Sequence, residues 1–86
     1  MKLILCPHCS DVVKLRKSRT CCECGKSWGL YVNDIDAEIN SQAIPLGFDN
    51  ASLVKAIKHR PLDGWGYQFS AFVIPFRCTT VVKVKE

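Results

Sequence analysis

Two short segments near the start of the chain hold five of its six cysteines, Cys6-Pro7-His8-Cys9 and Cys21-Cys22-Glu23-Cys24-Gly25. Two cysteines three positions apart curl into a turn with both sulfurs on one side, and two such turns supply the four thiolates of a tetrahedral zinc site. Cys21 and Cys22 are alternative ligands in the second turn. We favour Cys21, because the order C-x2-C-G closes the turn on a glycine, where a left-handed backbone is wanted. The spacing therefore predicts a metal site formed by Cys6, Cys9, Cys21 and Cys24.

The alternative role for these cysteines is a disulfide framework, as in small secreted domains. The apolar run that precedes Cys6 is far too short for the hydrophobic region of a signal peptide. Disulfides also rarely join two cysteines within such a tight pair. We therefore expect reduced cysteines in a cytoplasmic protein, with Cys78 as a free thiol at a strand edge.

The two turns resemble the knuckles of the zinc ribbon family, with Cys6 to Cys9 as the first knuckle and Cys21 to Gly25 as the second. The resemblance covers residues 1–32, and one departure is Ser10, which stands where the first knuckle often carries glycine. It implies one structural zinc ion per chain. It implies no single function, because zinc ribbons serve transcription, translation and enzyme scaffolds; the chain also resembles small phage-type zinc-ribbon proteins.

A basic segment lies between the two knuckles. From residue 11 to residue 20 the side chains alternate as in a strand followed by a turn, with Val13 and Leu15 on one face. Four basic residues fall within six positions: Lys14, Arg16, Lys17 and Arg19. They either form the solvated surface of a protected edge strand or contact the phosphates of a nucleic acid.

The second half of the chain predicts one helix and several strands. The helix begins at Asp49 or Asn50, buries positions 53, 54 and 57, and ends before Pro61. The loop after it holds Trp65 between two glycines, where the indole either fills the core or stacks on a base. Residues 43–48 are broken by Pro45 and Gly47 and predict a strand end or covering loop. Residues 68–74 predict a central strand covered on both faces, and residues 79–85 a closing strand.

These elements indicate an α+β fold: an N-terminal zinc ribbon over residues 1–32, joined to a small antiparallel sheet with one helix over residues 33–86. The two parts are expected to form a single compact domain, because 86 residues bury only about 60% of their unfolded surface. A structural metal compensates for so thin a core. No apolar run approaches the roughly 18 residues that a transmembrane helix needs.

The predicted function is binding without catalysis. Four thiolates leave zinc no open position for water, and the chain has no phosphate-binding glycine loop or paired acid and base. The net charge of +4 favours a polyanionic partner. Three hypotheses follow: nucleic acid bound by the basic segment, a phosphate-bearing ligand such as a nucleotide held as phage-type proteins would sequester it, or a protein-protein adaptor. The ligand pocket of the second hypothesis would use Lys58, Arg60, Trp65 and Tyr67.

Overall fold

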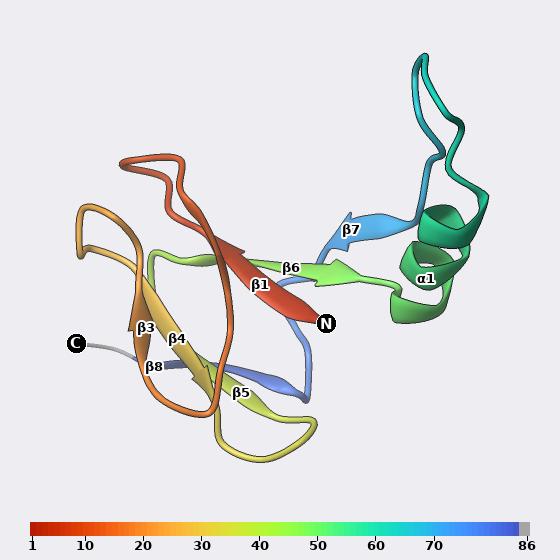
Figure 1. Cartoon of the computed structure of the whole chain (residues 1–86). Helices are drawn as coiled ribbons and strands as arrows, with labels where there is room; N and C mark the ends of the chain where they lie inside the picture. Colours follow the sequence, from red (N-terminus) through yellow and green to blue (C-terminus); the bar gives the residue numbers. More distant parts are fainter. Residues whose placement is uncertain (85–86) are drawn as a thin grey trace.

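The computed structural model describes residues 1–84, which form two four-stranded sheets and one helix (Figure 1). Sheet A has the strand order β2-β1-β6-β7 and consists of Val12–Lys14, Lys2–Leu5, Ile44–Phe48 and Ala71–Val73. Sheet B has the order β3-β4-β5-β8 and consists of Thr20–Cys21, Trp28–Tyr31, Ala37–Asn40 and Val81–Val84. Helix α1 spans Asn50–His59. The α+β class is thus confirmed, with two sheets in place of the single antiparallel one, and with β8 parallel to β5.

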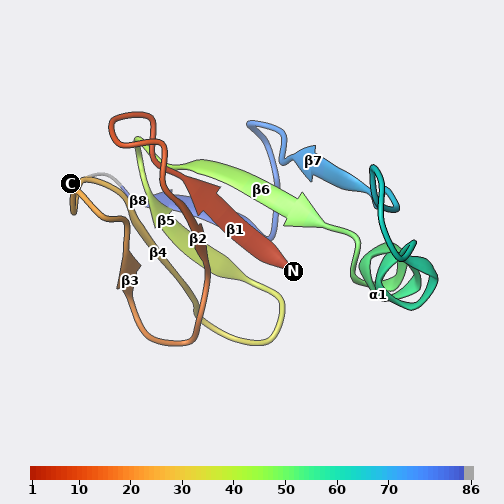
Figure 2. The ribbon, with the colours of Figure 1, turned by 45° about the horizontal axis from the view of Figure 1, so that its top comes forward.

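Both sheets are built from strands distant in sequence. The first half of the chain supplies β1 and β2 to sheet A and β3 and β4 to sheet B, and each sheet is completed by later strands (Figure 2). Side chains from both sheets form the core, a cluster of Ile4, Leu15, Ala37, Ile39 and Ala43. A further link joins the sheets where the N–H of Lys2 donates to the Tyr31 hydroxyl at 2.8 Å.

The basic segment crosses between the sheets instead of forming one hairpin. Its first strand, β2, pairs with β1 in sheet A, whereas β3 pairs with β4 in sheet B. The predicted alternation holds around the crossing, because Leu15 is buried in the core while Lys14 and Arg16 are exposed. Burial of Leu15 fixes the crossing point, and the N–H of Leu15 donates to the carbonyl of Lys2.

Residues 44–48 form a central strand of sheet A, which corrects the expectation of a strand end or covering loop. Pro45 lacks an N–H, yet its carbonyl accepts from the N–H of Ile74 at 2.9 Å. Strand β6 keeps its place because it pairs with β1 on one side and β7 on the other. The proline therefore costs one ladder donor and leaves the strand intact.

Helix α1 and the loop after it form an arm, residues 50–70, that extends from the end of β6 (Figure 1). The predicted cap is confirmed, since the Asp49 carboxylate accepts from the N–H of Ala51. The predicted buried stripe is wrong: Ala56 is the buried residue of the helix, and Val54 and Ile57 are each 50% exposed. Among residues 1–84, no helix is long and apolar enough to cross a membrane.

The segment predicted as a central strand is an edge strand. Within this segment the strand is β7, residues 71–73. It pairs with β6 alone among the described residues, and all three of its residues are exposed. The closing strand predicted over residues 79–85 is β8, in which Val81 packs against the core and Val82 is 54% exposed. Lys85 of that prediction lies outside the described residues.

Candidate metal centre

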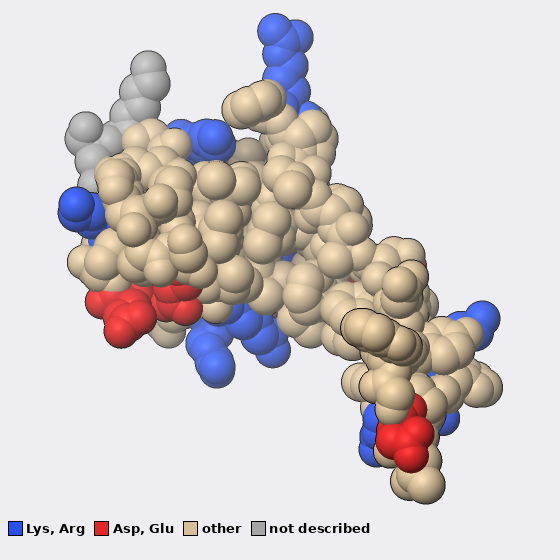
Figure 3. Space-filling model, turned by 90° about the horizontal axis from the view of Figure 1, so that it is seen from above, with Lys and Arg blue, Asp and Glu red and all other residues tan. Residues whose placement is uncertain are grey.

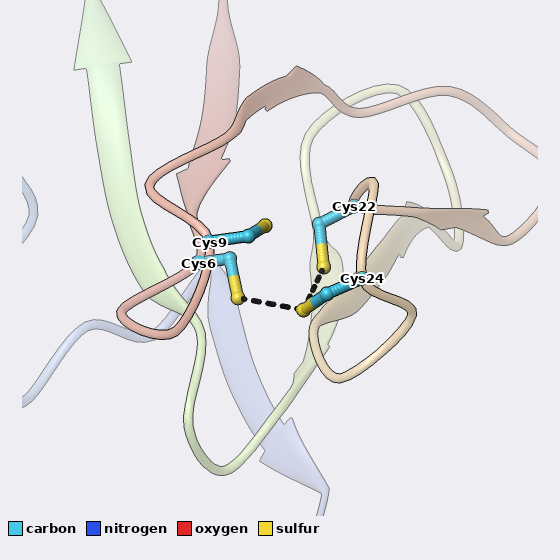
Figure 4. Close-up of side chains that lie close together, drawn as sticks. All are labelled: Cys6, Cys9, Cys22 and Cys24. Carbon is cyan, nitrogen blue, oxygen red and sulfur yellow. Dashed lines mark hydrogen bonds between the residues drawn. The ribbon is translucent and has the colours of Figure 1, made fainter.

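Four cysteine sulfurs converge at the end of the molecule where the two knuckles meet (Figure 4). The Sγ atoms of Cys6, Cys9, Cys22 and Cys24 all lie within 4.8 Å of one another. The Sγ of Cys24 is 3.6 Å from that of Cys6 and 3.5 Å from that of Cys22. A zinc–sulfur bond of about 2.3 Å gives a tetrahedron with an edge of about 3.8 Å, so the cluster has the size of a metal site with four thiolate ligands.

The cluster contains Cys22, not the predicted Cys21. Cys21 is the last residue of β3, paired with Trp28, and its side chain is exposed. Successive side chains of a strand point to opposite faces, so the next residue, Cys22, points inward and is buried. The second knuckle therefore starts one residue later and uses a C-x-C spacing.

The backbone hydrogen bonds of the two knuckles explain how the second knuckle closes despite its shorter cysteine spacing. The N–H of Cys6 donates to the carbonyl of Asp11, and the N–H of Cys22 donates to that of Ser27, so each first cysteine opens a loop closed five residues later. Each loop has a left-handed residue: Ser10 with φ 60° and Gly25 with φ 80°. Ser10 thus adopts the conformation that glycine usually supplies in a knuckle, at a steric cost that the closed loop sustains.

The site also holds the thiols in different protonation states when no metal is bound. Burial raises the pKa of Cys6, but the nearby hydroxyl of Ser27 and hydrogen bonds from knuckle N–H groups outweigh it and lower the pKa to about 5. The backbone bond at Lys26 lowers the pKa of Cys24, but burial and the three neighbouring thiols together raise it to about 12. The four sulfurs therefore repel one another as thiolates, and a bound dication removes that repulsion.

Two polar side chains that the sequence did not single out hold the second knuckle in place. Asn40, buried at the end of β5, donates to the carbonyl of Lys26 at 2.7 Å and accepts from the N–H of Trp28 at 3.1 Å. The carboxylate of Asp11, which follows the first knuckle, accepts from the N–H of Glu23 in the second at 2.9 Å. Neither had a signal in the sequence, because their partners lie 12 to 14 residues away.

Two cations of the basic segment have partners within the protein. The ammonium of Lys17 contacts the Asp34 carboxylate at 2.8 Å, and this contact lowers the pKa of Asp34. The guanidinium of Arg19 lies 3.9 Å from the centre of the Trp28 ring, whose indole is buried. Lys14 and Arg16 are exposed on the same segment.

The alternative ligand residues lie on the arm. Trp65 is fully exposed between Gly64 and Gly66, which both have positive φ, so of its two expected roles the one in the core is wrong. Tyr67 lies against His59 at the end of α1, with 5.9 Å between ring centres. Lys58 and Arg60 flank that histidine in sequence and are exposed. We call these four exposed residues of the arm the arm surface: Lys58, Arg60, Trp65 and Tyr67.

No family model, curated protein or solved structure matches this chain. The geometry alone therefore supports the conclusion that a cluster of four cysteines compatible with metal binding joins the two knuckles.

Proposed function

We propose that the chain is a non-enzymatic binding protein in which Cys6, Cys9, Cys22 and Cys24 hold one structural zinc ion. Four sulfur donors of tetrahedral size suit zinc, and a site that is filled by protein ligands offers no position for a substrate. The resemblance to the zinc ribbon family implies the same structural role for the zinc ion. The metal in this proposal stabilises the fold, and the binding surface lies elsewhere.

We propose further that this surface binds single-stranded nucleic acid and that it is the arm surface. The observation that carries this proposal is Trp65, a fully exposed indole in the loop that follows the basic end of α1. An exposed aromatic ring beside basic side chains is the combination that binds single strands, by base stacking and phosphate contacts. A fully exposed indole without such a role is unfavourable in free energy, because its apolar surface stays in water.

The distribution of charge supports the arm over the basic segment. Residues 1–49 hold six basic and six acidic side chains, whereas residues 50–84 hold five basic and one acidic. The net positive charge therefore belongs to the second part, and in the first part Lys17 is already paired with Asp34. Three of these five cations, Lys55, Lys58 and Arg60, lie on the arm together with the one acid, Asp63. A polyanion is attracted to the arm, and the basic segment becomes the alternative site through Lys14 and Arg16.

Fluorescence anisotropy with labelled single-stranded DNA and RNA oligonucleotides tests this proposal. Replacing Lys58 and Arg60 with alanine should weaken binding to every sequence and reduce the salt slope by about 0.7 for each lost phosphate contact. Trp65→Ala should cost about 1–3 kcal/mol of binding free energy, and Trp65→Phe should restore much of it because stacking needs only a ring. The matched control is the alanine pair at Lys14 and Arg16, which removes the same charge.

Three results would contradict it. If the wild type binds no oligonucleotide at low salt, the nucleic-acid function is wrong. If the control pair weakens binding as much as the arm pair, the site lies on the basic segment. If a free nucleotide displaces the oligonucleotide when both are present at the same concentration of phosphate groups, the partner is a small phosphate-bearing ligand.

A further inference from the structure

Strand β7 differs from the other outer strands of the two sheets because no charged residue lies within it or directly beside it in the sequence. Among residues 1–84 the outer strands are β2, β7, β3 and β8. Strand β2 contains Lys14, β8 contains Lys83, and Arg19 directly precedes β3. Charges of this kind protect edge strands from pairing with another chain. Strand β7 lies in an uncharged run from Gly64 to Phe76 and has no such protection.

The backbone of β7 offers hydrogen-bonding groups on its outer side. The N–H of Ile74 and the carbonyl of Ser70 both bond to the β6 side. Since the direction of these groups alternates along a strand, the N–H and C=O groups of Ala71 and Val73 face away from β6. No strand within residues 1–84 pairs with them.

Apolar side chains surround this edge. Phe72 is 55% exposed, Val73 66% and Phe76 97%. A cavity of about 370 Å³ adjoins the strand, and its wall includes Val73, Ile74, Phe76 and Lys83. The ammonium of Lys83 lies 5.6 Å from the centre of the Phe76 ring, so a cation borders this apolar surface. Figure 3 looks down on the molecule from above and shows a face whose middle is largely uncharged, with Lys and Arg side chains towards its margins. The strand itself thus has the apolar character of a buried surface.

The molecule exposes more surface than a compact monomer of its mass. The accessible surface is 6180 Å², whereas a compact monomer of this mass exposes about 5,100 Å². The radius of gyration is 14.2 Å, against about 12 Å for a compact chain of this length. The protruding arm contributes to this excess, which is larger than the roughly 800 Å² that each partner buries in a standard interface, so a dimer interface of standard size is compatible with it.

We propose that a second copy of this chain pairs with β7, antiparallel and about a two-fold axis at Phe72. In that register, Ala71 lies opposite Val73 of the second copy and Val73 opposite its Ala71. Their outward N–H and C=O groups then bond in two symmetric pairs and join the two A sheets into one. A second copy fits better than a charged partner, because the edge is uncharged and its outward residues are symmetric about Phe72. This inference is independent of the nucleic-acid proposal.

Sedimentation velocity and light scattering on the full chain, from low micromolar to several hundred micromolar, test the dimer. We expect the mass to rise with concentration from 9.7 kDa towards twice that value. Val73→Lys should raise the dissociation constant by about tenfold or more, because the two new ammonium groups meet diagonally across the pair. The matched control is Val12→Lys, which adds the same charge to β2 at the opposite edge of sheet A and should leave the dimer unchanged.

Amide hydrogen exchange of the wild type gives a test that needs no variant. The amides of Ala71 and Val73 should exchange more slowly as concentration rises, while those of α1 keep their rates. A mass of 9.7 kDa at every concentration would overturn the proposal and leave the edge open to another partner. A dimer unaffected by a folded Val73→Lys variant, or exchange at Ala71 and Val73 independent of concentration, would overturn it equally. If Val73→Lys does not fold, the exchange rates of the wild type decide.

Discussion

At the scale of single residues, the choice between Cys21 and Cys22 shows what spacing does and does not determine. Spacing identified both knuckles and three of the four clustered cysteines, Cys6, Cys9 and Cys24. The fourth depends on where β3 ends, because consecutive residues of a strand face opposite sides. That end is set by pairing between Cys21 and Trp28, a contact that local sequence does not reveal.

The two cysteines therefore make a sharp test. Cys22→Ser should abolish zinc binding, because serine replaces a buried thiol of the cluster, whereas Cys21→Ser should bind one equivalent of zinc with unchanged affinity. Metal content measured by mass spectrometry after purification, together with competition against a coloured chelator, distinguishes the variants. The opposite result, with Cys21 essential and Cys22 dispensable, would show that the knuckle begins at Cys21.

Asn40 should be the strongest polar contributor outside the cysteines. It is 1% exposed and satisfies two backbone groups of the second knuckle, so Asn40→Ala leaves a buried carbonyl and a buried N–H without partners. We expect a loss of about 1–3 kcal/mol for each unsatisfied group in the free energy of unfolding, measured by urea denaturation with zinc present. The exposed amide Gln68 offers the control, and Gln68→Ala should change stability by less than about 0.5 kcal/mol. Equal effects of the two changes would argue against a structural role for Asn40.

At the scale of elements, sequence patterns succeeded where a residue's neighbours are local. The helix cap at Asp49 depends on a bond to Ala51 two positions away, and it was predicted. The places of β6 and β7 within sheet A depend on partners far along the chain, and these places were not predicted correctly. An apolar run such as residues 68–74 reads the same whether it lies at the centre of a sheet or at an exposed edge. Covering by a second chain would give that run the burial its composition indicates.

The pair of knuckles should bind metal in a pH-dependent way. At neutral pH the metal-free site holds a proton on Cys24, whose pKa is raised to about 12, and metal binding expels that proton. The zinc association constant should therefore rise at least tenfold for each unit of pH around neutrality. Below pH 5 the slope should steepen, because Cys6, with a pKa of about 5, takes up a proton as well.

Competition with a chelator of known proton affinity at several pH values measures this slope. Calorimetry in two buffers of different ionisation enthalpy counts the released protons independently. An association constant that does not change between neutral and mildly alkaline pH would mean that the metal-free cluster is already fully ionised.

At the scale of the whole molecule, the cluster of four cysteines connects the two sheets. The first knuckle joins β1 to β2 in sheet A, and the second joins β3 to β4 in sheet B. Each sheet also contains strands from the second half of the chain. A metal ion bound by both knuckles would therefore hold the strands of both halves together. The hydrophobic cluster between the sheets is small, with Ile4 and Ile39 as its largest fully buried side chains, so it contributes little further stability.

Removing the metal should therefore unfold both sheets together, and not the N-terminal third alone. Structural zinc contributes an apparent 10–16 kcal/mol, roughly as much as the total stability of about 5–15 kcal/mol that a domain possesses. Amide exchange after addition of a strong chelator checks this: amides of β6 and β8 should lose protection at the same rate as those of β1 and β4. Addition of zinc should restore all four strands. If β6 and β8 keep their protection while β1 and β4 lose it, the second half of the chain is stable without the metal, and the knuckles stabilise only their own strands.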